Sequence, residues 1–102
     1  YSVQGQLSDT VYIANFQRPY SLLQLRDHLA KVGAEPGAAP VALKFFWIST
    51  LRDRCYVRFE NKEVARRAAK AMLRTRWPPE STTGARLYVS YIDYWEALER
   101  SE

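Results

Sequence analysis

The hexamer VYIANF (residues 11–16) and the octamer RDRCYVRF (residues 52–59) decide how this 102-residue chain is expected to fold. Both are short runs in which β-branched and aromatic side chains recur with the period of two that is typical of a β-strand. In the hexamer, this alternation turns Val11 and Ile13 to one side of the strand and Tyr12 to the other. The two segments therefore predict two strands, with an aromatic ring on the second side of the first strand.

The strand predicted within the octamer has one apolar side and one side that carries two arginines and a tyrosine. Its predicted strand covers residues 54–59, and its apolar side consists of Cys55, Val57 and Phe59. The opposite side consists of Arg54, Tyr56 and Arg58. Since an apolar strand side packs on a core, we expect the side with Tyr56 to face outward.

The rest of the chain predicts three helices and two more strands. Ser21 is a favourable N-cap for a helix over residues 22–32, where leucines recur every three or four positions, and Gly33 is expected to stop it. Asn61 is expected to cap a second helix, which ends before Trp77 and two prolines. The remaining elements are strands over residues 41–49 and 86–92 and a short C-terminal helix within DYWEALERSE.

This order of elements, β-α-β-β-α-β, predicts an α+β sandwich of the ferredoxin-like type. Such a fold has a four-stranded antiparallel sheet with two helices on one face, and its other face stays open. We expect an N-terminal extension at residues 1–9, one domain at residues 10–92 and a helical tail at residues 93–102. The sequence leaves open whether the tail covers the open face.

Composition argues for a binding module and against an enzyme. The net charge is +4, and the chain has one cysteine and one histidine, so we expect neither a disulfide nor a metal site nor any cofactor. A single cysteine suits a reducing compartment, and no apolar run is long enough to span a membrane. No set of nucleophile, base and paired carboxylates is visible, so no catalytic residue is predicted.

The open face has the chemistry that holds single-stranded RNA, namely rings for base stacking and cations for phosphates. Tyr12 and Tyr56 lie on the central strand pair of this topology with outward direction, so weak single-stranded RNA binding is expected. The further RNA-binding residues that we predict are Arg52, Arg54, Arg58, Tyr88 and Trp47. Two alternatives remain: the tail helix covers the tyrosines, or Trp47 points inward if the strand around it has the opposite alternation.

A second candidate surface lies on the second helix, on the side away from the sheet. Lys62, Arg66, Lys70 and Arg74 recur four residues apart and so form one line along the helix. Such a line is commonly a solvated face. It is also suited to contacts with phosphates or with an acidic protein partner.

The hexamer resembles the first ribonucleoprotein motif of RNA recognition motif (RRM) domains at every position. The octamer resembles the motif on the third strand of these domains through Arg52, Tyr56, Val57 and Phe59. It departs from that motif where Asp53 replaces a usual glycine, Arg54 replaces a usual aromatic, and Cys55 replaces a usual glycine or alanine. The resemblance implies an RRM fold, and the change at Arg54 weakens the implied RNA grip.

Within the RRM domains, the chain is similar to the Acinus type. The segments that carry this similarity are VYIANFQRPYSLLQLRDHL, FFWIS, RDRCYVRF and the Arg76-Trp77-Pro78 end of the second helix. The resemblance implies a nuclear scaffold in mRNA processing, part of an apoptosis- and splicing-associated complex that attaches near exon junctions. It implies splicing-associated protein partners, whose main binding motif is expected beyond residue 102. An RRM that binds proteins in place of RNA is the alternative function.

Overall fold

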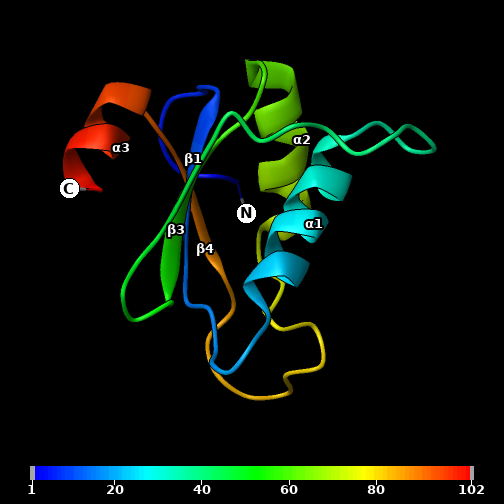
Figure 1. The fold of residues 1–102 in the computed structure, drawn as a ribbon, viewed down its shortest axis with the longest axis vertical. Coiled ribbons are helices and arrows are strands. Elements are labelled where there is room, and N and C mark those ends of the chain that lie inside the picture. Colours follow the sequence, from blue (N-terminus) through cyan, green and yellow to red (C-terminus); the bar gives the residue numbers. More distant parts are fainter. Residues whose placement is uncertain (1, 102) are drawn as a thin grey trace.

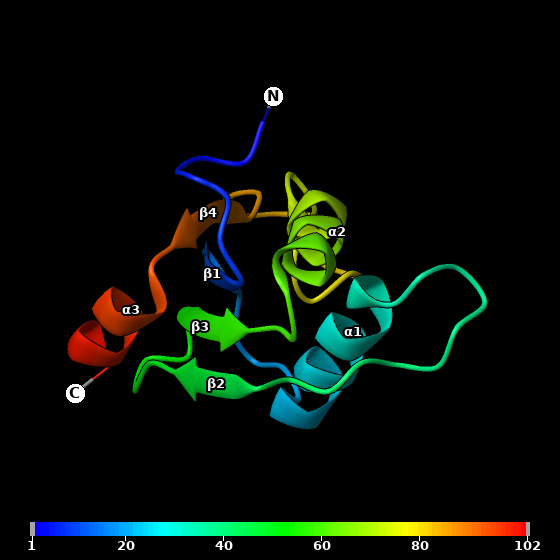
Figure 2. The same ribbon diagram turned by 90° about the horizontal axis from the view of Figure 1, so that it is seen from above.

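The computed structural model describes residues 2–101. Its elements are β1 (Thr10–Ala14), α1 (Leu22–Gly33), β2 (Phe45–Ile48), β3 (Arg54–Arg58), α2 (Lys62–Met72), β4 (Tyr88–Ile92) and α3 (Tyr94–Arg100). The strands form one antiparallel sheet in the order β2-β3-β1-β4, with α1 and α2 on one face and α3 on the other (Figures 1 and 2). This arrangement confirms the predicted βαββαβ sandwich and its short C-terminal helix.

The core lies between the sheet and the pair α1 and α2. Strand alternation supplies its floor, which includes Val11, Ile13, Cys55, Val57 and Val89, each at most 1% exposed. The helices supply its roof through Leu25, Leu29, Ala65, Ala68 and Met72. Complete burial of a Leu, Val or Met side chain contributes roughly 1.5–3 kcal/mol, so this layer is the main source of stability.

Side-chain caps fix the start of each helix. The Ser21 hydroxyl accepts a hydrogen bond from the backbone N–H of Gln24 at 3.3 Å, and the Asn61 amide oxygen accepts one from Val64 at 2.9 Å. At α3, one carboxylate oxygen of Asp93 accepts from the first turn. A cap of this kind contributes about 1 kcal/mol, and the first two confirm the predicted starts.

The prediction that Gly33 stops α1 from outside the helix is wrong, because Gly33 is the last helical residue. Space around this glycine is tight. A β-carbon at this position would lie 3.0 Å from the Val41 side chain and 3.1 Å from the Val64 side chain. The glycine therefore lets the end of α1 approach α2 and the segment before β2.

Two strands begin later than predicted, because the backbone N–H groups before them donate to other segments, and β3 ends one residue early, at Arg58. The strand expected over residues 41–49 is β2, Phe45–Ile48, and the N–H of Val41 instead donates to the Ala30 carbonyl at 3.0 Å. The strand expected over residues 86–92 is β4, Tyr88–Ile92, because the N–H of Leu87 donates to Thr75 at 2.7 Å. Both loop contacts are between segments far apart in sequence, which strand propensity does not encode.

The segment before β1 lies along the outer edge of β4. Gln4 makes a parallel bridge to Ser90, and its carbonyl accepts from the N–H of Tyr91 at 2.8 Å. The Ser8 hydroxyl donates to the Ile92 carbonyl at 2.6 Å. This segment therefore covers the β4 edge; the division into residues 1–9, 10–92 and 93–102 stays a prediction.

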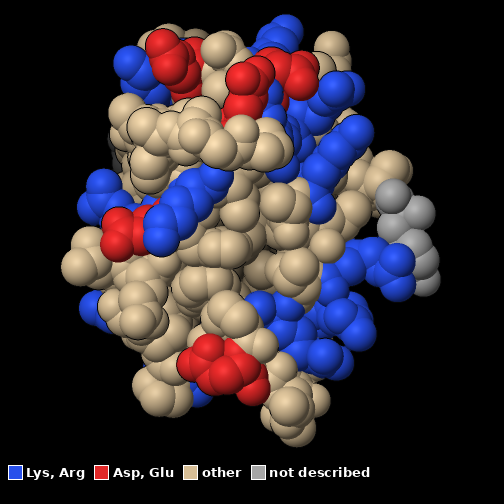
Figure 3. Space-filling view, turned by 90° about the vertical axis from the view of Figure 1, so that its right-hand side faces the viewer, with Lys and Arg blue, Asp and Glu red and all other residues tan. Residues whose placement is uncertain are grey.

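Basic side chains gather on the outer side of α2. Figure 3 shows Lys and Arg on the right-hand side of the view, over α2 and the loop that follows it. The line is present on α2 through the exposed residues Lys62, Arg66 and Lys70. The prediction that the helix continues to Trp77 is wrong, because α2 ends at Met72, so Arg74, also exposed and with φ 67°, lies beyond the helix. Arg66 pairs with Glu63 at 3.4 Å, whereas Arg67, outside this line, donates to the Gly33 carbonyl and so ties α2 to α1.

Candidate nucleic-acid interface

Three aromatic side chains form a row across the sheet on the face away from α1 and α2. In the strand pairing, Trp47 lies opposite Tyr56, and Tyr56 lies opposite Tyr12. The Trp47 and Tyr56 rings are stacked with centroids 5.3 Å apart, and the Tyr56 and Tyr12 rings are tilted with centroids 5.4 Å apart. Phe46 and Ile48 pack against the core, so Trp47 points to the open face, and the alternative with Trp47 inside is excluded.

The row is accessible at one end and closed in its middle. Tyr88, on β4, places its ring 6.0 Å from that of Tyr12 in an edge-on arrangement and is 45% exposed. Tyr56 is only 6% exposed, although it points to the open face. Burial raises the pKa of the Tyr12 hydroxyl above its usual value. Tyr88 is therefore the most exposed of these rings, and Tyr12 beside it is partly exposed.

The two arginines on β3 differ in how firmly they are held. Arg58 makes a 3.0 Å ion pair with Asp9, and its guanidinium lies 4.0 Å from the centre of the Tyr94 ring. The hydrogen bond with Asp9 raises the pKa of Arg58. Arg54 makes a 3.1 Å pair with Asp53 in which both side chains are 44% exposed. A pair that is this exposed contributes little, so Arg54 is the easier of the two to redirect to a phosphate.

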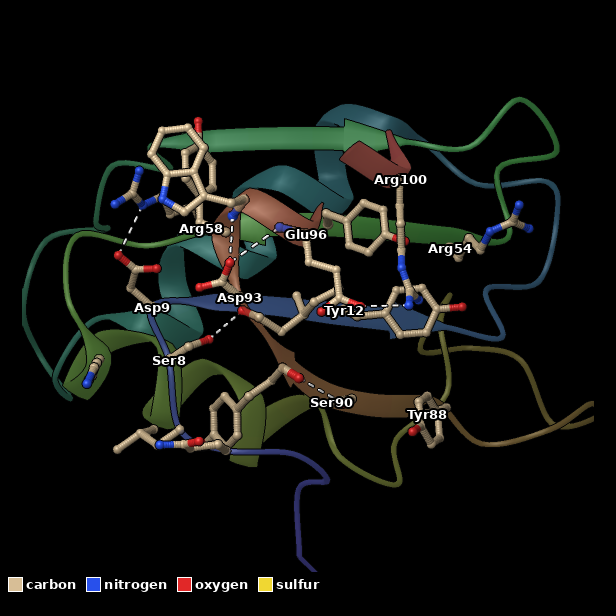
Figure 4. Close-up of a pocket in the computed structure, with 18 residues that line it drawn as sticks. Ser8, Asp9, Tyr12, Arg54, Arg58, Tyr88, Ser90, Asp93, Glu96 and Arg100 are labelled. Carbon is tan, nitrogen blue, oxygen red and sulfur yellow. Dashed lines mark hydrogen bonds and ion pairs between the residues drawn. The ribbon is translucent and has the colours of Figure 1, made fainter. Parts of the chain in front are cut away.

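Helix α3 lies on this face of the sheet, which resolves what the sequence left open. Between α3, the N-terminal segment and the sheet is a cleft of about 920 Å³. Figure 4 shows Tyr12, Tyr88 and Arg54 toward one end of the cleft and Asp9 and Arg58 toward the other. Glu96 and Arg100 of α3 form a 2.6 Å ion pair, which Figure 4 shows in front of Tyr12. The helix narrows the open face without filling it.

Neither a metal nor a membrane feature is present in the part of the chain that the structure describes. Within residues 2–101, no group of three or more His, Cys, Asp or Glu side chains is placed to hold a metal ion. No helix among these residues is both long and apolar enough to cross a bilayer.

Comparison with known proteins agrees with this geometry. Residues 8–92 match the family described as ACIN1-like, RNA-recognition domain. The chain belongs to this family. The mouse protein named apoptotic chromatin condensation inducer in the nucleus (Acinus) is 29% identical over 75 residues, which are 74% of this chain and 5% of that protein. The chain thus spans about 5% of the length of this relative.

A solved structure supports the fold of this RNA-recognition domain. The RRM domain of Puf1 from S. pombe superposes with a TM-score of 0.59 at 15% identity, over 82% of this chain and 96% of that one. Identity this low bears on the fold alone. The predicted resemblance to RRM domains, and to the Acinus type among them, is confirmed by the family match. Domains of this family are RNA-binding-type folds that are in general not enzymes.

The structure brings together most of the residues that the sequence predicted for RNA binding. Those that border the cleft or the aromatic row are Tyr12, Tyr56, Tyr88, Trp47, Arg54 and Arg58. Arg52 instead borders a separate hollow near the loop after β1. Of the α2 line, Lys62 borders the cleft, while Arg66, Lys70 and Arg74 are not among its residues.

Four α3 residues border the cleft, and sequence reasoning missed two of them, Glu96 and Arg100, while Tyr94 and Trp95 are the others. A signal was present, because Glu and Arg four residues apart on a predicted helix form an ion pair on one face. The direction of that face relative to the sheet depends on how α3 packs. Ala97, fully buried, marks the side of α3 that contacts the rest of the domain.

Proposed function

We propose that this domain binds single-stranded RNA weakly on the sheet face, with bases stacked on Tyr12 and Tyr88. The observation that supports this proposal is the continuous row of rings that borders an open cleft. Tyr56 and Trp47 form the floor that holds the Tyr12 ring in place. Stacking on an aromatic side chain contributes about 1–3 kcal/mol per base, so two rings suit weak binding.

Arg54 and Arg58 are the proposed phosphate contacts. Arg54 supplies a guanidinium beside Tyr12 that an incoming phosphate can draw away from Asp53. Arg58 is already paired, so its contribution is expected to be electrostatic, without a new hydrogen bond. Lys62 borders the other side of the same cleft and is a third cation that the backbone can reach.

A titration of the chain with short uridine-rich RNA, followed by NMR, tests the proposal. Amide signals of β1, β3 and β4 should shift, while those of α1 should not. The variant Tyr12→Ala should weaken binding by about 1–3 kcal/mol, and Leu23→Ala, at an exposed position of α1, is the matched control. Unchanged affinity in the Tyr12 variant would reject stacking on the sheet.

The wider setting of the domain is proposed from its relationship to Acinus. We propose that it acts in the nucleus as part of an Acinus-like scaffold in mRNA processing, within an apoptosis- and splicing-associated complex linked to exon junctions. The mouse relative is named for the nucleus, which supports this location. The expected partners are splicing-associated proteins that bind mainly outside the domain. Immunoprecipitation of the full-length protein with and without this domain tests the assignment.

Protein binding by the domain itself is the second candidate function. The low exposure of Tyr56, the arginine at position 54 and the presence of α3 on the sheet favour it, because each reduces the surface that RNA can reach. The α2 line would then be the docking surface for an acidic partner. Reversal of Arg66 and Lys70 to Glu should abolish capture of such a partner and leave RNA affinity nearly unchanged. Captured proteins that stay the same would exclude α2.

A further inference from the structure

A second hollow lies at the end of the sheet where β1 leaves for α1. It has a volume of about 440 Å³ and is bordered by Arg18, Pro19 and Tyr20 from the β1–α1 loop and by Arg52 from the β2–β3 turn. Its lining surface is mostly apolar, and the residues that border it carry two guanidinium groups, a proline ring and a tyrosine ring. None of Arg18, Pro19 and Tyr20 was predicted from the sequence to contact a ligand.

Hydrogen bonds between the two segments hold the hollow in shape. The Tyr20 hydroxyl donates to the Arg52 carbonyl at 2.7 Å, and the N–H groups of Asn15 and Phe16 donate to the Asp53 carbonyl at 2.9 and 3.1 Å. The Tyr20 ring packs on the buried Phe16 ring with centroids 5.7 Å apart. Burial raises the pKa of Tyr20 to about 12. The hollow is therefore formed before any ligand arrives.

The charge of this hollow is unbalanced. Among the ion pairs formed by residues 2–101, none involves Arg18 or Arg52. The nearby carboxylate of Asp53 is already engaged, because it accepts from the Ser49 hydroxyl at 2.8 Å and pairs with Arg54 at 3.1 Å. Two guanidinium groups without a carboxylate partner favour an anion, and planar guanidinium groups bind phosphate in particular.

We infer that this hollow binds one further nucleotide of the RNA strand, beyond those on the sheet. Its phosphate would lie between Arg18 and Arg52, and its base or ribose against Pro19 and Tyr20. A nucleotide suits the hollow better than an acidic peptide, because it joins an anion to a flat apolar group within the same unit. Arg54, which borders the cleft, follows Arg52 by two residues, so the two sites adjoin. This inference rests on the proposed RNA binding by the sheet.

The test compares RNA lengths in the intact chain. Isothermal titration with a uridine trinucleotide and a uridine hexanucleotide is run on the wild type, on Arg18→Gln and on Lys31→Gln. Lys31 lies near the other end of α1, away from the hollow. The variant Lys31→Gln removes one positive charge, as Arg18→Gln does, so it is the matched control. We expect Arg18→Gln to weaken binding of the hexanucleotide by about 10-fold or more, as for loss of a hydrogen bond to a charged group, and to leave binding of the trinucleotide nearly unchanged.

Salt dependence supplies an independent readout. Loss of one phosphate contact should reduce the slope of log affinity against log salt by about 0.7 for the hexanucleotide, and Lys31→Gln should leave that slope unchanged. Equal loss for both lengths, or no loss for either, would overturn the inference. The inference would also be overturned if a poly-glutamate peptide shifted the NMR amide signals of Tyr20 and Arg52 and the hexanucleotide did not. The hollow would then bind an acidic protein.

Failure of this inference is distinguishable from failure of the proposed function. If Tyr12→Ala weakens both RNA lengths while Arg18→Gln changes neither, the sheet binds RNA and the hollow does not. If Arg18→Gln weakens the hexanucleotide while Tyr12→Ala changes nothing, the hollow binds RNA and stacking on the sheet is wrong.

Discussion

Neighbouring residues of strand β3 are buried on opposite faces of the sheet, and they contact different kinds of side chain there. Cys55 and Val57 are fully buried against α1 and α2, whereas Tyr56 between them is 6% exposed on the opposite face. The first two contact aliphatic side chains of the helices, and Tyr56 contacts the rings of Trp47 and Tyr12. Low exposure on one face therefore comes from packing against the helices, and on the other it comes from packing among aromatic rings. Four substitutions test this difference between the two faces.

The largest expected effect is on the helical face. Phe59 is among the largest fully buried side chains, and Phe59→Ala leaves a cavity beside α1 and α2. We expect this variant to lower the free energy of unfolding by about 3–5 kcal/mol in chemical denaturation. A loss under 1 kcal/mol would mean that the helical face is not the main source of stability.

On the open face, the same type of substitution should act on binding and spare the fold. Tyr88→Ala removes a ring that is 45% exposed, so its free energy of unfolding should change by no more than about 0.5 kcal/mol. RNA affinity should fall by about 1–3 kcal/mol, measured by titration calorimetry. The comparison between the faces would break if Tyr88→Ala destabilised the domain as much as Phe59→Ala does.

Helix α3 is expected to compete with RNA for the open face. Asp93→Ala removes the cap that accepts hydrogen bonds from Trp95 and Glu96 and should destabilise α3 by about 1 kcal/mol. If α3 must move for RNA to reach Tyr12, the affinity of this variant for RNA should rise, by at most about 5-fold. Weaker binding would show that α3 contributes contacts to the ligand. Asp93→Asn, which keeps an acceptor, is the control.

The smallest expected effect is on the pH dependence of stability, and it again concerns the helical face of the sheet. Burial, and then the charge of Lys31, lowers the pKa of His28, whose ring lies 4.9 Å from that of Trp77. The unfolded chain takes up this proton first as the pH falls through about 6.5, so the folded state should lose stability there. Because the chain has one histidine, His28→Gln should reduce the drop in melting temperature between about pH 8 and pH 5. An equal drop in both proteins would exclude His28.

Much of this comparison could be predicted from sequence, because it depends on strand alternation. The period of two in the octamer assigns Cys55 and Val57 to one face and Tyr56 to the other, and the Asn61 cap fixes where α2 begins. The exposed fraction of Tyr56 could not be predicted in this way. It depends on the strand pairing of Tyr56 with Trp47 and Tyr12, and these residues lie far apart in sequence.

The missed features share a physical origin in contacts between distant segments. Nothing local to Arg18-Pro19-Tyr20 indicates that Tyr20 will donate to the carbonyl of Arg52. The late start of β2 follows from the contact of Val41 with α1, and the tight space at Gly33 follows from the close packing of Val41, Val64 and Phe59 around it. Such contacts are set by how the elements pack, and propensity and periodicity describe each element alone.

The Trp47–Tyr56–Tyr12 row has a practical consequence for experiments. The three tryptophans occupy three different surroundings: Trp47 in the row, Trp77 buried beside His28, and Trp95 on α3 with 72% of its surface exposed. Indole emission depends on its surroundings, so the unlabelled chain is its own spectroscopic probe. If Trp77 and Trp95 are each replaced by Phe, the remaining emission comes from Trp47 alone. A change in that emission on addition of RNA would report that a base has stacked in the Trp47–Tyr56–Tyr12 row.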